Sequence, residues 1–175
     1  KGIMREGVMS VIKHFPGHGD TSIDSHTDLP VLDHNLDRLN SFEMAPFKNA
    51  IDAGAEAVMV AHILLPHIDS KRPSSLSEKV IGKVLREDMD FEGIIMTDDL
   101  TMGAITENYA LDAAGVLAID AGCDIILVCH GYENQFKVMD ALISAVKEGK
   151  LCEDSIDKSL YRIIKLKEIY KLNDS

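Results

Sequence analysis

The sequence predicts an α/β fold built on a parallel β-sheet, and three observations lead to that prediction. Short β-branched apolar runs alternate with segments of helical periodicity, in the order βαβαβαβα. The runs are almost uninterrupted in their apolar character, which is typical of parallel strands covered on both faces. One cassette of helix, glycine and strand also occurs twice. This alternation predicts either a doubly wound sheet or a closed eight-stranded barrel.

The repeated cassette comprises residues 50–62 and residues 118–130, which lie 68 residues apart and are identical at seven of thirteen positions. Each copy has the pattern of a last helical turn, a glycine and an apolar run that ends on a histidine. We expect Gly54 and Gly122 to take the left-handed C-cap conformation. Residues 8–14 and 94–98 resemble the strand part of the cassette, which brings the number of expected strands to four.

Helical patterns fill the intervals between these strands. Residues 75–78 fit a capping box, and the apolar residues after them recur at helical spacing. The same periodicity predicts helices over residues 110–121 and 134–148, and a final amphipathic helix over residues 155–171. We expect the helix over 134–148 to bury one apolar stripe, consisting of Phe136, Met139, Leu142, Ile143 and Val146.

The number of strands predicts an incomplete barrel. A full (β/α)8 barrel takes about 250 residues, and this chain has 175 residues, with about four βα units and a C-terminal helix. We therefore expect residues 1–175 to form the C-terminal half of a TIM-like barrel. A half-barrel has two unpaired strand edges, so it needs an upstream half, a partner copy or a different closure.

Composition excludes some classes of partner. The 18 Lys and Arg residues are outnumbered by 29 Asp and Glu residues, for a net charge of −11. That balance argues against binding to nucleic acid or to anionic membrane surfaces. The chain lacks an apolar stretch near 18 residues, so we expect no membrane insertion. It begins at Lys1 rather than at a Met, which leaves the compartment open between bacterial cytoplasm and cell surface or secretion.

Ionisable residues lie at the carboxyl ends of all four expected strands. They are Lys13 with His14, then His62, then Asp98 with Asp99, and finally His130. Ligands of parallel α/β folds bind at this edge of the sheet. The sequence therefore predicts that these side chains converge on one site.

Asp98 is the main candidate for covalent chemistry. A carboxylate held at a strand end can act as a nucleophile, a general base or a metal ligand, although either member of the Asp98–Asp99 pair could instead cap the next helix. The capping role suits Asp99 better. Lys13 and His14 are placed to donate hydrogen bonds to a substrate, and a salt bridge to Asp98 is an equally good interpretation of their spacing.

The stretch from Lys13 to His26 contains three histidines, two aspartates and two glycines in fourteen residues. Asp24 and His26 are two residues apart, so their side chains share a face in an extended segment, where the carboxylate can orient the imidazole for proton transfer. His18 and Asp20 have the same spacing, and the pattern alone does not choose between the pairs. The flanking glycines indicate that His18 shapes the loop.

These motifs together resemble a known family. The sequence Lys-His-Phe-Pro-Gly-His-Gly-Asp-Thr, followed by Asp-Ser-His, Met-Val-Ala-His-Ile and Met-Thr-Asp-Asp-Leu-x-Met, is similar to family-3 glycoside hydrolases that act as β-N-acetylglucosaminidases. The match extends from Val11 to about Gly122, and the long histidine-bearing loop distinguishes this branch from the β-glucosidases of the family.

The resemblance implies a TIM-like barrel and a retaining mechanism through a covalent glycosyl-enzyme. Asp98 then corresponds to the nucleophile, and His26 to the general acid/base assisted by Asp24. Lys13 and His14 correspond to residues that bind N-acetylglucosamine. The resemblance implies no cofactor and no metal, and it assigns no firm role to His62. Expected substrates are peptidoglycan fragments or chitin oligomers.

Two other hypotheses remain open at this point. A metal-dependent hydrolase would use imidazole and carboxylate ligands, with candidates His14, His18, Asp24, His26 and Asp98. A non-catalytic sugar-binding half-domain is conceivable because the chain is short. Family members also contact the sugar from earlier strands for which this chain has no counterpart, so we expect residues 1–175 alone to be inactive.

Overall fold

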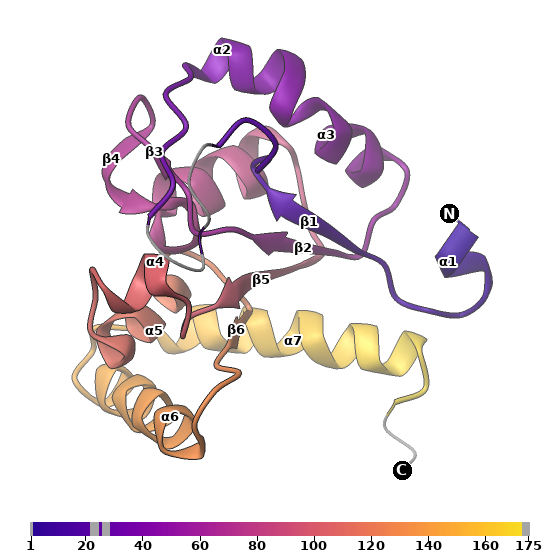
Figure 1. The fold of residues 1–175 in the computed structure, drawn as a ribbon. Coiled ribbons are helices and arrows are strands. Elements are labelled where there is room, and N and C mark those ends of the chain that lie inside the picture. The colour runs from indigo at the N-terminus through magenta and orange to yellow at the C-terminus, as the bar shows by residue number, and fades with distance from the viewer. Residues whose placement is uncertain (1, 22–24, 26–28, 173–175) are drawn as a thin grey trace.

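The main sheet has four parallel strands. The computed structural model describes residues 2–21, 25 and 29–172. The strands lie in the order β1 (Val11–Phe15), β2 (Ala57–Val60), β5 (Ile94–Asp99) and β6 (Ile125–Leu127), and every adjacent pair is parallel (Figure 1). This order follows the chain without the reversal that defines a doubly wound sheet. It is the order of consecutive strands in a (β/α)8 barrel, and the predicted α/β fold is confirmed as a fragment of such a barrel.

One face of the sheet packs against the helices that connect the strands. These are α3 (Ala45–Asp52), the π-helix η3 (Lys79–Asp88) and α5 (Leu111–Asp120). The resulting core joins Val58, Val60 and Ile95 of the strands to apolar residues of these helices, such as Leu85. Burying a side chain of this size stabilises a fold by roughly 1.5–3 kcal/mol. This layer therefore holds the strand order in place.

Both cassette glycines end their helices as predicted. Gly54 has a φ of +88° and Gly122 a φ of +107°, in the region where a side chain is strained. Their N–H groups donate to the carbonyls of Ile51 and Ile119, at 2.8 and 3.0 Å. The two copies of the cassette thus turn from helix to strand in the same way.

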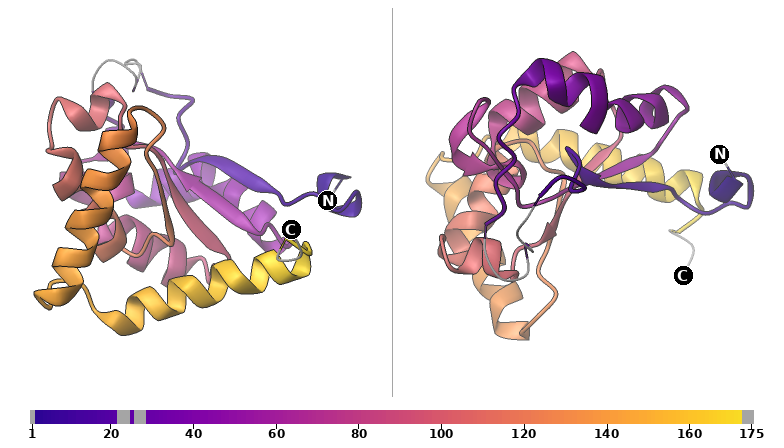
Figure 2. Two further views of the ribbon diagram at one scale, coloured as in Figure 1. Left: turned by 90° about the horizontal axis from the view of Figure 1, so that it is seen from below. Right: turned by 45° about the horizontal axis from the view of Figure 1, so that its top comes forward.

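The opposite face of the sheet is covered near the beginnings of its strands by α7 (Glu153–Ile169). Ala57 and Ile94, the first residues of β2 and β5, form a small cluster with Met96, and two residues of α7, Ile163 and Leu166, pack against it. Figure 1 shows α7 on the other side of the sheet from α3, and in Figure 2 it extends along the sheet as one long helix. The helix therefore closes the amino ends of the strands, far from the predicted site.

Further elements complete the described chain. They are α1 (Gly2–Arg5), α2 (Leu36–Arg38), the π-helical turn η1 (Leu39–Glu43), the 3-10 turn η2 (Ser74–Leu76), α4 (Gly103–Thr106) and α6 (Tyr132–Lys147). An antiparallel pair, β3 (Leu64–Leu65) and β4 (Asp69–Pro73), follows β2. This pair was not predicted, because its second strand is mostly polar and has no alternating apolar pattern.

The predicted buried stripe of α6 is only partly right, because Leu142 packs against the core while three of the five predicted residues are exposed. Val138 and Ala145 are buried, whereas Phe136, Met139 and Ile143 are 62%, 48% and 46% exposed. The reason is the contact with α5, where Gly115 allows close approach: a Cβ at Gly115 would lie 2.6 Å from Val138 Cγ1. The helix buries Val138 and Ala145 and presents Phe136, Met139 and Ile143 outward.

Two further expectations are corrected. The capping box over residues 75–78 does not form, because the Ser75 hydroxyl contacts His62 and it is Ser77 Oγ that accepts from Val80 N, at 3.4 Å. Strand β6 ends at Leu127, before His130.

Candidate active site

Asp98 lies at the carboxyl end of β5, on the face of the strand opposite to the connecting helices. It shares that face with Ile94 and Met96, because side chains alternate along a strand. Its Oδ1 accepts a hydrogen bond from the N–H of Asp99 at 2.9 Å, and its Oδ2 lies 3.8 Å from Nε2 of His14. The Asp98 side chain is 21% exposed. One carboxylate oxygen is thus held by the main chain, while the other faces His14.

His14 is the sequence-predicted residue that the structure places directly beside Asp98. It comes from β1, and the β1–β2 register shifts between Ile12 and Phe15. The peptide bonds Lys13–His14 and Phe15–Pro16 are both cis. Lys13 is exposed on the same strand. The His14 imidazole and the Asp98 carboxylate therefore lie together at the carboxyl ends of two strands of the parallel sheet.

Asp99 has a structural environment that differs from that of Asp98. Its carboxylate accepts from Thr101 N, from Thr101 Oγ1 and from Cys129 N, at 3.0, 2.5 and 3.0 Å. Burial raises the pKa of Asp99, but these hydrogen bonds outweigh it and hold the pKa below its ordinary value. Asp99 does not cap a helix, because α4 begins only at Gly103, after Met102. It ties the end of β5 to the segment after β6.

The two cassette histidines converge on Asp99, in agreement with the predicted convergence of the strand-end residues, although the sequence did not predict their individual contacts. His62 is fully buried, and its Nε2 lies 2.9 Å from the main-chain oxygen of Asp99, while its Nδ1 lies 2.7 Å from Ser75 Oγ. His130 is 82% exposed, with Nε2 3.6 Å from Asp99 Oδ2. Burial lowers the pKa of His62 more than the carbonyl of Asp99 and the charges of Asp98 and Asp99 raise it.

The loop after β1 is organised by His18, as its flanking glycines suggested. Its Nδ1 lies 2.6 Å from Thr21 Oγ1 and its Nε2 lies 3.2 Å from Ser25 Oγ. The His18 ring is also edge-on to His14, with centroids 6.4 Å apart. Ser25 is buried, and its carbonyl accepts from Ala104 N at 3.1 Å. Asp24 and His26, the predicted acid/base pair, lie outside the described residues.

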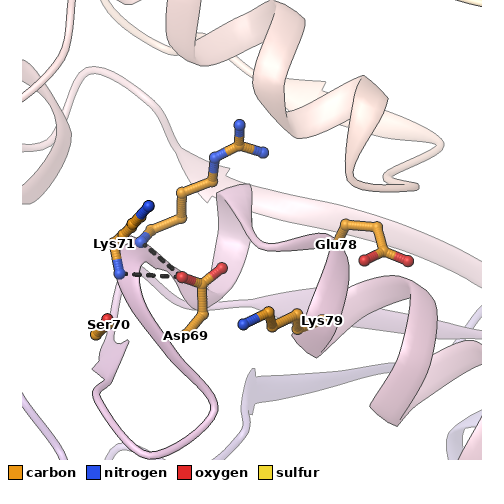
Figure 3. Close-up of a pocket in the computed structure, with 6 residues that line it drawn as sticks. Asp69, Ser70, Lys71, Glu78 and Lys79 are labelled. Carbon is orange, nitrogen blue, oxygen red and sulfur yellow. Dashed lines mark hydrogen bonds between the residues drawn. The ribbon is translucent and has the colours of Figure 1, made fainter.

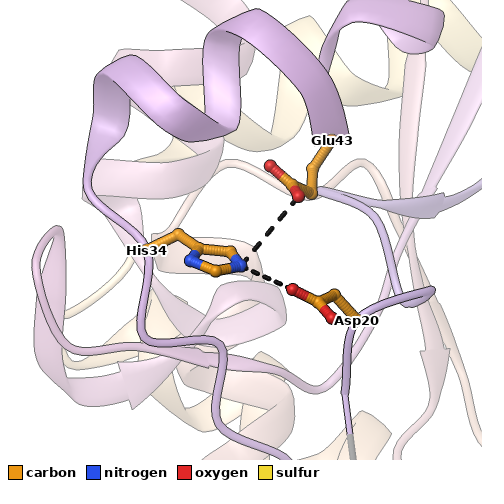
Figure 4. Close-up of side chains that lie close together, drawn as sticks. All are labelled: Asp20, His34 and Glu43. Carbon is orange, nitrogen blue, oxygen red and sulfur yellow. Dashed lines mark hydrogen bonds and ion pairs between the residues drawn. The ribbon is translucent and has the colours of Figure 1, made fainter.

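A compact group of possible metal ligands, Asp20, His34 and Glu43, lies at the base of this loop (Figure 4). Nε2 of His34 is 2.7 Å from Asp20 Oδ2 and 4.0 Å from Glu43 Oε1. Arg38 donates to both Glu43 oxygens, which places a positive charge where a cation would bind. The hydrogen bond from Arg38 is the main cause that lowers the pKa of Glu43. We interpret this group as a polar clasp across the loop.

The clasp bears on the hypothesis of a metal-dependent hydrolase. Among the described residues it is the one His, Cys, Asp and Glu group compact enough for a metal ion, and it contains none of the candidates proposed from the sequence. His34 and Glu43 had no motif that could have singled them out, because their proximity to Asp20 arises only from the path of the loop.

A pocket of about 330 Å³ lies away from Asp98, between β4 and the start of η3 (Figure 3). The carboxylate of Asp69 accepts from the N–H groups of Lys71 and Arg72, at 3.0 and 3.3 Å, and from Ser77 Oγ at 2.8 Å. The Ser77 contact ties β4 to the segment that leads into η3. We assign the pocket to the scaffold.

The part of the chain that the structure describes contains no helix that is both long enough and apolar enough to cross a membrane.

Comparison with known proteins gives consistent matches. Residues 1–166 match the family model described as the glycosyl hydrolase family 3 N terminal domain. Beta-hexosaminidase A of Pseudoalteromonas piscicida is 34% identical over 185 residues, which cover 95% of this chain and 31% of that protein. The beta-hexosaminidase of Methylobacillus flagellatus is 38% identical over 147 residues, covering 84% of this chain and 41% of that protein.

A solved structure has the same fold over nearly the whole chain. The glycoside hydrolase family 3 beta-N-acetylglucosaminidase from Paenibacillus sp. str. FPU-7 superposes with a TM-score of 0.97 at 43% identity, covering 99% of this chain and 33% of that one. The chain therefore spans between 31% and 41% of the length of these three proteins.

Proposed function

Because residues 1–166 match its model, this chain belongs to glycosyl hydrolase family 3, and we propose that the complete protein is an exo-acting retaining β-N-acetylglucosaminidase. Its substrates are peptidoglycan fragments or chitin oligomers with a terminal N-acetylglucosamine. The observation that carries this proposal is the meeting of Asp98 and His14 at the carboxyl ends of two parallel strands, with Oδ2 and Nε2 3.8 Å apart. The names of the similar proteins support the same activity.

Asp98 acts as the nucleophile. Its Oδ2 attacks the anomeric carbon, an ester bond forms, and the glycosidic bond breaks with both electrons going to the leaving oxygen. The bond from Asp99 N to Oδ1 supports this role, because it orients the carboxylate and leaves Oδ2 for attack. Lys13 and His14 bind the sugar from β1, as donors to its hydroxyl and amide oxygens.

His26 acts as the general acid and then as the general base, assisted by Asp24. It protonates the departing oxygen, and in the second step it takes a proton from the water that attacks the anomeric carbon and releases Asp98. Asp24 stabilises the imidazolium that exists before the first step and after the second. Ser25, which separates the two residues in the sequence, is buried and bonded to His18 and Ala104, and His18 lies edge-on to His14.

Residues 1–175 supply the C-terminal half of the catalytic barrel. Within the described residues, β1 and β6 are the two outer strands of the sheet, and each pairs on one side. An upstream half of the barrel would pair with both and would bring further sugar-binding groups to the same mouth. The fraction of each related protein that this chain covers supports that division.

The stereochemistry of the product tests the proposed mechanism. When the complete protein cleaves an aryl β-N-acetylglucosaminide, whose leaving group is not a sugar, ¹H NMR should detect the β anomer of the released N-acetylglucosamine first, with the α anomer appearing later by mutarotation. A retaining double displacement requires this order. If the α anomer appears first, water attacks directly and Asp98 is not a nucleophile.

Two controls separate the proposal from the other hypotheses. Turnover in excess chelator should equal turnover without it, and a loss restored by added zinc would favour a metal-dependent hydrolase. Binding of N-acetylglucosamine by the complete protein without any release of sugar would favour a non-catalytic module.

A further inference from the structure

His62 is a buried histidine that the catalytic steps above do not use. It follows the end of β2 and has no exposed surface. Its ring bridges two groups from different parts of the chain, the Ser75 hydroxyl at 2.7 Å and the main-chain oxygen of Asp99 at 2.9 Å. Both ring nitrogens of this buried imidazole thus have a hydrogen-bond partner. The identity of the two partners indicates what the histidine does.

The partners of His62 determine which ring nitrogen carries the proton. A carbonyl oxygen can only accept, so Nε2 must donate to Asp99. Burial lowers the pKa of His62, which keeps the ring neutral, and Nδ1 then accepts the hydroxyl hydrogen of Ser75. The Ser75 hydroxyl and the Asp99 carbonyl therefore select the Nε2–H tautomer together.

The carbonyl that His62 binds belongs to the residue immediately after the proposed nucleophile. The same oxygen accepts from Met102 N at 3.1 Å, which closes the turn that follows β5. The N–H of Asp99 donates to Asp98 Oδ1 at 2.9 Å. The main chain of Asp99 is thus bound on both sides, by His62 at its carbonyl and by Asp98 at its N–H.

We propose that His62 is a positioning residue that orients Asp98 through the main chain of Asp99. The inference rests on the proposed function, in which Asp98 is the nucleophile. A neutral donor suits this position, because a cation would stabilise the Asp98 carboxylate, whose charge is lost when the glycosyl ester forms. Donation by Nε2–H fixes the turn and adds no such charge.

Kinetics of two variants of the complete protein test the proposal. His62→Leu keeps an apolar side chain in the space but removes the donor, whereas the amide nitrogen of His62→Gln can reach the Asp99 carbonyl. We expect His62→Leu to lower kcat by about 100-fold, the scale of a small misplacement of a reacting group, with KM within about threefold. His62→Gln should restore at least about a tenth of the wild-type kcat, and its pH profile should keep both limbs.

His67→Leu is the matched control. His67 is 52% exposed, pairs with Asp33 at 2.9 Å and lies in the turn between β3 and β4, so its replacement should leave kcat unchanged. Equal losses in the Leu and Gln variants, or an effect on KM alone, would overturn the proposal. Disappearance of a limb of the pH profile in His62→Gln would also overturn it, because His62 would then exchange protons itself.

Two measurements decide the inference independently of turnover. Long-range ¹H–¹⁵N spectra should show the Nε2–H tautomer of His62 in the folded protein at neutral pH. A crystal structure of His62→Leu should show the Asp99 turn and the Asp98 carboxylate displaced. A charged ring, the other tautomer or an unmoved Asp98 would refute the inference. If the wild-type protein releases no sugar, the proposed function fails, and these two results still judge the role of His62.

Discussion

Asp98 and Asp99 are adjacent carboxylates with different surroundings, and the difference assigns their tasks. Asp98 has one oxygen bound by the main chain and one facing His14. Asp99 has its carboxylate engaged by Thr101 and Cys129. Chemistry at a carboxylate requires an available oxygen, so Asp98 is suited to react and Asp99 to support the strand end.

Replacing each aspartate by asparagine should separate these tasks. Asp98→Asn in the complete protein should lower kcat/KM by at least about 10³-fold, because an amide is not a competent nucleophile, while the thermal midpoint stays near that of the wild type. Asp99→Asn should lower the free energy of unfolding by about 1–3 kcal/mol. The NH₂ of the new amide cannot accept the hydrogen bonds that the carboxylate accepts from main-chain N–H groups. Steady-state kinetics and urea unfolding measure the two effects. An inactive but fully stable Asp99→Asn together with an active Asp98→Asn would reverse the assignment.

Acid should weaken the fold through Asp99 and Asp69. Burial raises the pKa of each, but the hydrogen bonds that they accept lower it below the ordinary value of 3.8. Such groups contribute stability that is present above the unfolded pKa and is lost as pH falls through the folded one. The free energy of unfolding should therefore fall from about pH 5 to pH 3, and less steeply in Asp69→Asn. Identical pH slopes for the variant and the wild type would contradict this account.

At the level of residues, sequence reasoning brought Asp98 and His14 to the same edge of the sheet but did not predict the contacts that support them. These two came from the motif and from their positions at strand ends, and they do lie together. The contacts of Asp99 with Cys129 and of His62 with Ser75 join segments 30 and 13 residues apart. Pairings of this kind depend on how the strand ends are placed in space, and no local pattern encodes them.

The elements of the fold followed from the sequence to differing degrees. The four parallel strands were predicted because β-branched apolar runs identify strands buried on both faces, and glycines marked the ends of α3 and α5. The inward face of α6 was not predictable from its periodicity, because the close contact of Val138 with Gly115 chose a different side of the helix. Periodicity shows that a helix is amphipathic, while small residues on its neighbour determine the contact.

The attachment of α7 depends on a buried carboxylate, Asp124. Its side chain is fully buried and accepts from Arg86 on η3, from Arg162 on α7 and from the N–H of Ile95. We expect Asp124→Ala to lower the free energy of unfolding by about 3–5 kcal/mol, because two arginines lose their shared partner. Urea unfolding of the complete protein measures this loss.

Asp120→Ala is the matched control for that prediction. Asp120 is an exposed aspartate at the end of α5, and its replacement should change the free energy of unfolding by no more than about 0.5 kcal/mol. Equal effects at the two positions would show that the Asp124 network does not hold α7 to the sheet.

At the scale of the whole chain, the end of the sheet that α7 covers is opposite to the end that holds the proposed site. The helix α7 covers the amino ends of the strands, and Asp98 with His14 lies at their carboxyl ends. This division is the one that (β/α)8 barrels use. The sequence predicted a site at the carboxyl ends of the strands, but the position of α7 and the exposed apolar residues of α6 became known only from the structure.

Residues 1–175 produced alone should self-associate. The outer strands β1 and β6 offer unpaired edges within the described part of the chain, and α6 exposes Phe136, Met139 and Ile143. We expect light scattering after size exclusion to show a mass that rises with concentration, and no release of sugar. Addition of the upstream half should give one complex of constant mass that releases sugar. A stable, well-folded monomer at all concentrations would contradict the half-barrel account.

The central claim is that Asp98 forms a covalent bond with the sugar, and mechanism-based labelling tests it most directly. The complete protein is incubated with a fluorinated N-acetylglucosaminide whose activated leaving group permits the first step and whose fluorine slows the second. Peptide mass spectrometry should locate the sugar on Asp98, and Asp98→Asn should remain unlabelled. A label on any other residue, or none in an enzyme that turns over its substrate, would contradict the account.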